Sequence, residues 1–193
     1  MKANHTKNLL AESLIRLMSK APLDSISVTD IANDCDLNRH TFYYHFKDKQ
    51  DLVCWIFDRD ITEHQKMPPL DGSSLDKDAF FVRDIIQYMY SNKVFYINAL
   101  NSTAQNSLQD HLFKHIRAFR EVQIESVLNG RVIDDVCRDF IADYFSNAMS
   151  GFIVRWSKDG MRDQSKIFFP GFKNVAYRCM QFLLDNYIED QAL

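Results

Sequence analysis

The fold is decided by the stretch from Ile26 to Leu52, ISVTDIANDCDLNRHTFYYHFKDKQDL. Its first half carries apolar residues at the i, i+3, i+4, i+7 spacing of one buried helix face, namely Val28, Ile31, Ala32 and Cys35. Ser27, with Asp30 three residues later, resembles a capping box with a shorter acid. We therefore predict a helix that begins near Ser27 and stops near Asp36.

A tight turn over Asp36-Leu37-Asn38 should join this helix to a second one, because Asp and Asn tolerate left-handed backbone. Asn38 can then accept the unpaired N–H groups at the start of the second helix. There Phe42 and Phe46 share the buried face, which leaves four residues pointing outward: Arg39, His40, Tyr43 and Tyr44. Such exposed donors suit a reader of the DNA major groove. The two helices are predicted to form a helix-turn-helix that docks on DNA.

The following helix should begin at Asp48, because Asp48 and Asp51 can cap it. Lys49 lies in its first turn, so a cation and free N–H groups can together hold a backbone phosphate. The helix then runs to about Gln65 and connects the helix-turn-helix with the rest of the chain. We expect it to act as the lever between the two parts.

The segment SVTDIANDCDLNRHTFYYHFKDKQDL resembles the DNA-binding segment of TetR-type transcriptional regulators, and TFYYHFKDKQDL is especially similar. It departs from the family's usual small residue and Gly in the turn, where it has Cys35-Asp36, and it has Asn38 where Ser is common. Arg39, His40 and Tyr43 are expected at or near base edges. The resemblance implies mainly phosphate contacts for Thr41, Tyr44, His45 and Lys49. Thr29 can also reach the groove, and Asn38 completes the set of predicted DNA-binding residues.

The formal net charge of −3 is unusual for a DNA-binding protein, which is expected to be basic. Residues 1–50 hold seven Lys or Arg against six Asp or Glu, a net of +1, and the remainder holds sixteen against twenty, a net of −4. The asymmetry has the right sign but is small. Affinity for DNA should therefore rest on a few placed contacts and on the use of two copies.

The sequence offers no catalytic or metal-binding pattern of known spacing. The four cysteines form no CxxC pair, and no Ser-His-Asp elbow, P-loop or dinucleotide glycine pattern is present. His111 and His115 have the i, i+4 spacing of paired metal ligands, with Asp110 adjacent, but no third ligand converges in the sequence. We therefore expect that the protein is not an enzyme and that it binds neither a metal ion nor a cofactor. Without a leader or an apolar run that could cross a bilayer, the chain is expected to be cytoplasmic and to bind no membrane.

The chain divides into three predicted parts: a DNA-binding domain at 1–46, a connecting helix at 47–66 and a dimerisation and regulatory domain at 67–193. A first helix between Thr6, a predicted N-cap, and Pro22 should brace the helix-turn-helix through Leu10, Leu14, Leu17 and Met18. Lys66 to Asp78 should be a loop, with two prolines, a glycine and two serines. The helical period then returns and no segment alternates with period two, so the fold is predicted to be all-α.

The last two helices, near 134–159 and from Pro170 onward, are apolar on two sides. In the first of them one face should hold Ile141, Tyr144, Phe145, Ala148 and Phe152, and in the second Leu183 and Met180 lie on different stripes. A helix with two apolar sides needs two partners, and a second copy of the same helix pair is the simplest one. The resemblance implies the same homodimer, which would bind a pseudo-palindromic operator in double-stranded DNA.

The segment SGFIVRWSKDGMRDQ is similar to that of the branch of the family containing regulators of dihydroxyacetone kinase operons. Some members of that branch are believed to respond to a partner protein, so the switch is expected to be a small-molecule effector or a protein co-regulator. Few cations lie within the apolar stripes, which favours a neutral effector, and the face from Trp156 to Asp163 is a predicted partner surface. The alternative function is a helical protein-interaction module whose helix-turn-helix does not read DNA.

Overall fold

The computed structural model of the chain describes residues 2–64, 83, 85–162 and 172–191. All regular structure in these residues is helical, so the all-α prediction is confirmed. The elements are α1 (Lys2–Met18), the 3-10 helix η1 (Leu23–Ser25), α2 (Val28–Asp34), α3 (Arg39–His45), α4 (Lys49–His64), α6 (Lys93–Leu100), α7 (Leu108–Leu128), α8 (Asp135–Lys158) and α9 (Phe172–Gln191). Residues 85–91 are also helical. The predicted loop from Lys66 to Asp78 lies wholly outside the described residues, as does Pro170.

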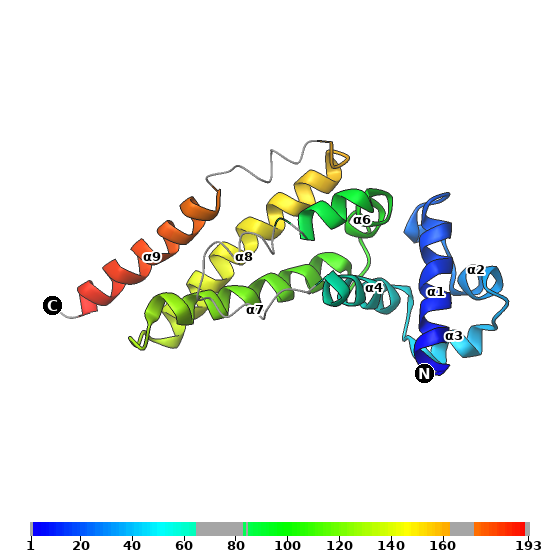
Figure 1. Cartoon of the computed structure of the whole chain (residues 1–193), viewed down its shortest axis with the longest axis horizontal. Helices are drawn as coiled ribbons and strands as arrows, with labels where there is room; N and C mark the ends of the chain where they lie inside the picture. The colour runs from blue at the N-terminus through cyan, green and yellow to red at the C-terminus, as the bar shows by residue number, and fades with distance from the viewer. Residues whose placement is uncertain (1, 65–82, 84, 163–171, 192–193) are drawn as a thin grey trace.

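The helices α1, α2 and α3 gather at one end of an elongated molecule, and α4 leads from them into the rest (Figure 1). The long helices α7 and α8 run side by side in opposite directions, and α6 lies between α8 and α1. α9 lies at the end far from the helix-turn-helix. The surfaces of α3 and α9 are therefore separated by the length of the molecule.

The first helix begins earlier than predicted. α1 starts at Lys2, so Thr6 lies inside the helix and is not its N-cap. The apolar stripe is as predicted: Leu10, Leu14 and Met18 are buried and Leu17 is half-buried. The helix ends at Met18, four residues before Pro22, which agrees with the predicted limit.

Two hydrophobic clusters fill the molecule. The larger runs from α1, α2 and α3 through Leu52 and Ile56 of α4 to Ile153 and Trp156 of α8. The smaller joins the end of α7, the start of α8 and α9. Because the first cluster is continuous, α4 is packed on both the helix-turn-helix and the second half of the chain. The predicted domain limits at residues 46 and 66 stay predictions.

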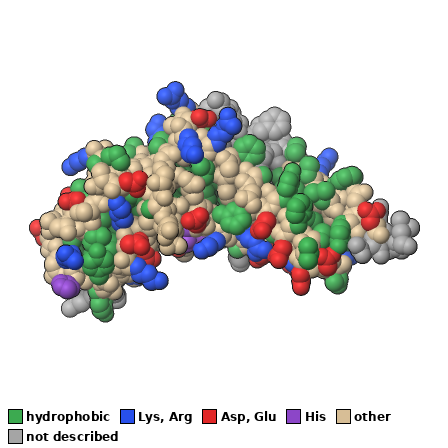
Figure 2. Space-filling model, turned by 180° about the vertical axis from the view of Figure 1, so that it is seen from behind, with side chains coloured by type: hydrophobic (Ala, Val, Ile, Leu, Met, Phe, Trp, Pro, Cys, Tyr) green, Lys and Arg blue, Asp and Glu red, His purple; other side chains and the backbone are tan. Residues whose placement is uncertain are grey.

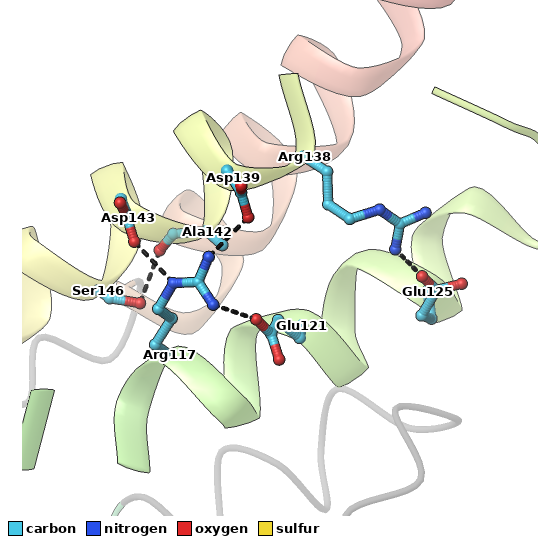
Figure 3. Close-up of polar contacts among 8 residues, drawn as sticks. All are labelled: Arg117, Glu121, Glu125, Arg138, Asp139, Ala142, Asp143 and Ser146. Carbon is cyan, nitrogen blue, oxygen red and sulfur yellow. Dashed lines mark hydrogen bonds and ion pairs between the residues drawn. The ribbon is translucent and has the colours of Figure 1, made fainter. Parts of the chain in front are cut away.

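Ion pairs also hold α7 and α8 together. Arg117 of α7 donates to Asp139 and Asp143 of α8, at 2.7 Å each, and to Glu121 on its own helix (Figure 3). Arg138 of α8 pairs with Glu125 of α7 in the same view. The hydrogen bond to Asp143 and the surrounding carboxylates raise the pKa of Arg117. These pairs fix the register of the two helices.

The apolar residues of α8 do not share the single face predicted. The helix buries Ile141, Phe145 and Met149, while Tyr144, Ala148 and Phe152 are exposed. Adjacent residues lie about 100° apart on a helix, so neighbours such as Tyr144 and Phe145 point into different surroundings. The exposed side carries an apolar residue every four positions: Val136, Phe140, Tyr144, Ala148 and Phe152.

The prediction that α9 has two apolar sides is confirmed. Met180 and Leu184 are buried in the smaller cluster, and Tyr177, Tyr187 and Ile188 pack against it. The other side exposes Val175, Cys179, Phe182 and Leu183. Hydrophobic side chains accordingly gather at the end of the molecule far from the helix-turn-helix (Figure 2).

Trp156 is not part of an exposed face, contrary to prediction. Only 3% of it is exposed, and its ring stacks on Tyr90 with 6.4 Å between centroids. The way in which α8 ends explains the presence of Gly160 in this segment. Gly160 is left-handed, with φ 75°, and the next N–H, of Met161, donates to the carbonyl of Trp156 at 2.9 Å. Asp163 lies outside the described residues.

Within the described part of the chain, none of the helices combines the length and apolarity needed to cross a membrane.

Candidate nucleic-acid interface

Both ends of α2 are fixed by its own sequence. Ser27 and Asp30 form the predicted capping box: the Ser27 side chain accepts from the Asp30 N–H at 3.1 Å, and the Ser27 N–H donates to the Asp30 carboxylate at 2.9 Å. The hydrogen bonds from the Ser27 side chain and backbone lower the pKa of Asp30. At the other end Asp36 is left-handed, with φ 54°, and the Leu37 N–H donates to the Ala32 carbonyl at 2.9 Å. Asp36 thus holds the position that Gly usually holds in such a helix end.

The start of α3 is also fixed as predicted. Asn38 is its N-cap, and the Asn38 side-chain oxygen accepts from the N–H and the hydroxyl of Thr41, at 2.8 and 3.1 Å. Phe42 and Phe46 are buried, and Phe46 packs edge-on against Trp55 of α4. The inner face of α3 is therefore anchored to the core, and its orientation is set by α4.

The outer face of α3 carries the predicted reading residues. Arg39 and His40 are exposed, as are Tyr43 and Tyr44, with 51% and 83% of their surface accessible. Thr29 of α2 and Asn38 are also exposed, and Thr41 and His45 are half-buried. The Tyr44 and His45 rings meet edge to face with 4.9 Å between centroids. Seven of these eight predicted residues lie on α3 or at its N-cap, and Thr29 lies in the first turn of α2.

Lys49, unlike the other predicted DNA-binding residues, binds backbone carbonyls of its own chain. Its ammonium group donates to three backbone carbonyls, of Leu23 at 2.7 Å, Asp24 at 3.1 Å and Ile26 at 2.8 Å. An ammonium group has three donors, so these bonds occupy them all. Lys49 therefore ties the start of α4 to η1, a contact over more than twenty residues of chain that local sequence patterns do not reveal. The neighbouring Lys47 is exposed.

The segment between α1 and α2 is also bound by α6. Asn98 of α6 donates to the carbonyls of Met18 and Ala21, at 3.1 and 2.9 Å, and accepts from the N–H of Leu23 at 2.7 Å. Close by, Ser102 donates to the Asp24 carboxylate at 2.7 Å. Displacement of α6 or α4 would therefore be transmitted directly to the helix-turn-helix. Sequence reasoning missed these contacts, because an isolated Asn in an apolar helix carries no local signal of its partner.

An apolar pocket of about 280 Å³ lies beside α4, between α7, α8 and residues 85–86. Its walls include Phe57 and Ile61 of α4, Phe119 of α7 and Met149 of α8. Among the described residues that line it, Arg120 is the one Lys or Arg, and it donates to Gln123. The expectation that few cations lie within the apolar stripes therefore has one exception here, Arg120, which is buried on α7.

Comparison with known proteins gives two family matches. Residues 11–54 match the family described as "Bacterial regulatory proteins, tetR family", and residues 79–178 match the one described as "Transcriptional regulator C-terminal region". The second match alone spans more than half of the chain.

A curated relative is the HTH-type dhaKLM operon transcriptional activator DhaS of Lactococcus lactis subsp. lactis (strain IL1403), which is 26% identical over 153 residues, or 79% of this chain and 73% of that protein. A solved structure with a similar fold is the dihydroxyacetone kinase operon activator DhaS, with a TM-score of 0.55 and 19% identity over 94% of this chain and 96% of that one. Both relatives come from the branch that the segment around Trp156 resembles. The chain belongs to the TetR family of DNA-binding transcriptional regulators.

Proposed function

We propose that this regulator reads a pseudo-palindromic DNA operator as a homodimer, with α3 of each subunit in the major groove. The observation that supports this proposal most directly is the outer face of α3, where Arg39, His40 and Tyr43 are exposed. The inner face of the same helix is buried and its N-terminus is capped. A rigid helix of this kind loses little freedom on binding, so its donors can discriminate base edges.

The remaining residues divide between groove and backbone. Thr41, Tyr44 and His45 are assigned to phosphates, and Thr29 to the edge of the groove. The oxygen of Asn38 is used in the cap, so its amide nitrogen is the atom assigned to a phosphate. Lys49 is the weakest member of the set, because its donors are occupied by backbone carbonyls. We assign the phosphate contact to exposed Lys47 in its place.

The homodimer is supported by the exposed apolar sides of α8 and α9. Phe140 of α8 and Phe182 of α9 are 67% and 66% exposed, and α9 lies at the end of the molecule far from α3. Apolar surface on adjacent helices is covered when the same pair of helices from a second copy packs on it about a two-fold axis. The dimer would bind DNA with two copies of α3. The second copy compensates for the weak DNA affinity expected from a net charge of only +1 over residues 1–50.

The switch is assigned to the apolar pocket beside α4. An effector changes DNA affinity only if it binds two conformations unequally, and α4 lines the pocket while its first turn holds η1. The pocket favours a mainly apolar small molecule with one acceptor group for Arg120. A protein co-regulator is the second candidate, as the resemblance of the segment around Trp156 implies, but Trp156 itself is buried and cannot contribute to its surface. In either case the chain would act by binding and not by catalysis.

Selection of bound fragments from a genomic library tests this function. We expect a common pseudo-palindromic sequence, and we expect Arg39→Ala and Tyr43→Ala to bind the selected and a scrambled fragment equally well while keeping the wild-type fold. Lys158→Ala, which removes an exposed cation at the end of α8, is the matched control and should keep full discrimination. Equal binding of selected and random DNA by the wild-type protein would favour the alternative, a helical interaction module with a non-reading helix-turn-helix.

A further inference from the structure

Three potential metal ligands meet where α4 packs on α7. Asp58 of α4 lies opposite His111 and His115, which are one turn apart on α7. One carboxylate oxygen of Asp58 is 2.7 Å from the Nε2 of His111 and 2.8 Å from the Nε2 of His115. The two Nε2 atoms are 3.2 Å apart. The expectation that no third ligand converges on the two histidines is therefore wrong, because the third ligand comes from a different helix.

These three contacts cannot all be hydrogen bonds. A carboxylate oxygen only accepts, so each contact with Asp58 requires a proton on the Nε2 of that histidine. Both N–H groups are then directed at the same Asp58 oxygen, and the 3.2 Å contact between the two Nε2 atoms pairs two donors. If one Nε2 lacks its proton, its lone pair faces the carboxylate oxygen. A single cation between the three atoms removes the conflict, because all three then direct a lone pair at a positive charge.

The spacing of the three atoms suits a small divalent ion. With bonds of about 2.0–2.2 Å, neighbouring ligand atoms in octahedral or tetrahedral geometry are about 2.8–3.6 Å apart. The observed 2.7, 2.8 and 3.2 Å lie within a few tenths of an ångström of that range. Two imidazoles and one carboxylate are a donor set preferred by Zn²⁺ and related transition metals over Ca²⁺ or Mg²⁺, which prefer oxygen.

The site is accessible and its surroundings are acidic. The side chains of His111, Asp58 and His115 are 26%, 44% and 44% exposed, which leaves room for water to complete the coordination. Asp58 and His111 open into a surface pocket of about 360 Å³. The charged residues lining this pocket are Asp48, Asp51, Asp58 and Asp110 against Lys47 and Lys114. Burial, and then Asp58 and Asp51, raise the pKa of the neighbouring Cys54 thiol to about 11.

We propose that Asp58, His111 and His115 bind one divalent transition-metal ion of the Zn²⁺ type in each subunit. The bound ion joins α4 to α7, beside the apolar pocket that Phe57 and His115 also line. Phe57 packs edge-on against both imidazoles, with ring centroids 5.8 and 5.4 Å away, and thereby holds them in place. The site does not depend on DNA binding, so its test and the test of the proposed function are independent.

The test uses the untagged full chain, freed of metal by dialysis against a chelator and titrated with Zn²⁺ in competition with a chromophoric chelator. We expect one equivalent per chain. Asp58→Asn, His111→Gln and His115→Gln should each weaken binding by about tenfold or more, since loss of even an outer partner of a metal ligand costs about that much. His5→Gln, which removes an exposed histidine of α1, is the control and should bind as the wild type does.

Two further measurements separate coordination from other effects. Co²⁺ in place of Zn²⁺ should give visible absorption bands in the wild type that are lost in the ligand variants. Zn²⁺ should also raise the thermal midpoint of the wild type and of His5→Gln, but not that of the ligand variants, because the ion binds only the folded site. Should Asp58→Asn fail to fold, the two histidine variants, which alter partly exposed side chains, decide the question. Absence of stoichiometric binding, or unchanged affinity in the folded ligand variants, would overturn the proposal.

Discussion

Asp36 is the residue at which the sequence departs most from an ideal helix-turn-helix turn. Its φ of 54° lies in the left-handed region, where a side chain is strained and glycine is not. We predict that Asp36→Gly raises the free energy of unfolding by about 0.5–1 kcal/mol and that Asp36→Ala lowers it by a similar amount. Urea unfolding at one fixed protein concentration measures both. Equal stability of the Ala and Gly variants would show that the turn is not strained.

Lys49 separates two roles that the sequence alone cannot distinguish. Its ammonium group satisfies three carbonyls of the segment before α2, so Lys49→Met should lower the free energy of unfolding by about 1.5–3 kcal/mol. Lys47→Met should leave stability unchanged and reduce the salt dependence of DNA binding by about one phosphate contact. Denaturation and salt titrations of both variants decide the assignment. The opposite pattern would return the phosphate contact to Lys49.

At the scale of elements, α9 offers a direct test of the dimer. Leu183 lies on its exposed apolar side, whereas Met180 is 1% exposed and belongs to the core of its own subunit. Leu183→Glu should therefore separate the subunits while keeping the helical content, because an unpaired charge in a desolvated seam is costly. Met180→Glu should instead unfold the smaller hydrophobic cluster. Of the two apolar stripes of α9, the one with Leu183 is thus available to a second subunit, and the one with Met180 packs within its own.

Light scattering and circular dichroism distinguish these outcomes. Gln181→Glu adds the same charge to an exposed position of α9 outside the apolar stripe and is the matched control, expected to stay dimeric. Phe140→Glu on the exposed side of α8 should reproduce the effect of Leu183→Glu. If both variants scatter as the wild-type dimer does, the interface lies elsewhere.

The helix α6 should control the mobility of the segment that precedes α2. In Asn98→Ala three hydrogen bonds are lost, one of them from the N–H of Leu23. We predict faster hydrogen exchange in residues 18–26 and a free energy of unfolding lowered by about 1–3 kcal/mol. Asn101→Ala is the control, since Asn101 follows the last residue of α6 and its side chain donates to the carbonyl of Ile97 in the same helix. Unchanged exchange in Asn98→Ala would show that α6 does not hold this segment.

For the whole molecule, the sequence predicts well what depends on neighbours along the chain. The helix-turn-helix, its capping box at Ser27 and the cap at Asn38 follow from periodicity and cap chemistry within a few residues. The sequence does not predict that Tyr144 is exposed or that Met180 and Trp156 are buried. The spacing of apolar residues shows which of them share a face of a helix, but not which partner each face contacts. The contacts of Lys49, Asn98 and Asp58 join residues far apart in the chain, and only the assembled fold brings them together.

The central claim is that two copies of α3 read one operator from a dimer held together at its far end. Hydroxyl-radical footprinting of a selected fragment tests it most directly. We predict two protected patches on one face of the DNA, related by a two-fold axis and centred about 34 Å, or a multiple of it, apart. The monomeric Leu183→Glu variant should lose both patches at the concentration at which the wild type protects them. A single patch, or uniform protection along the fragment, would contradict the account.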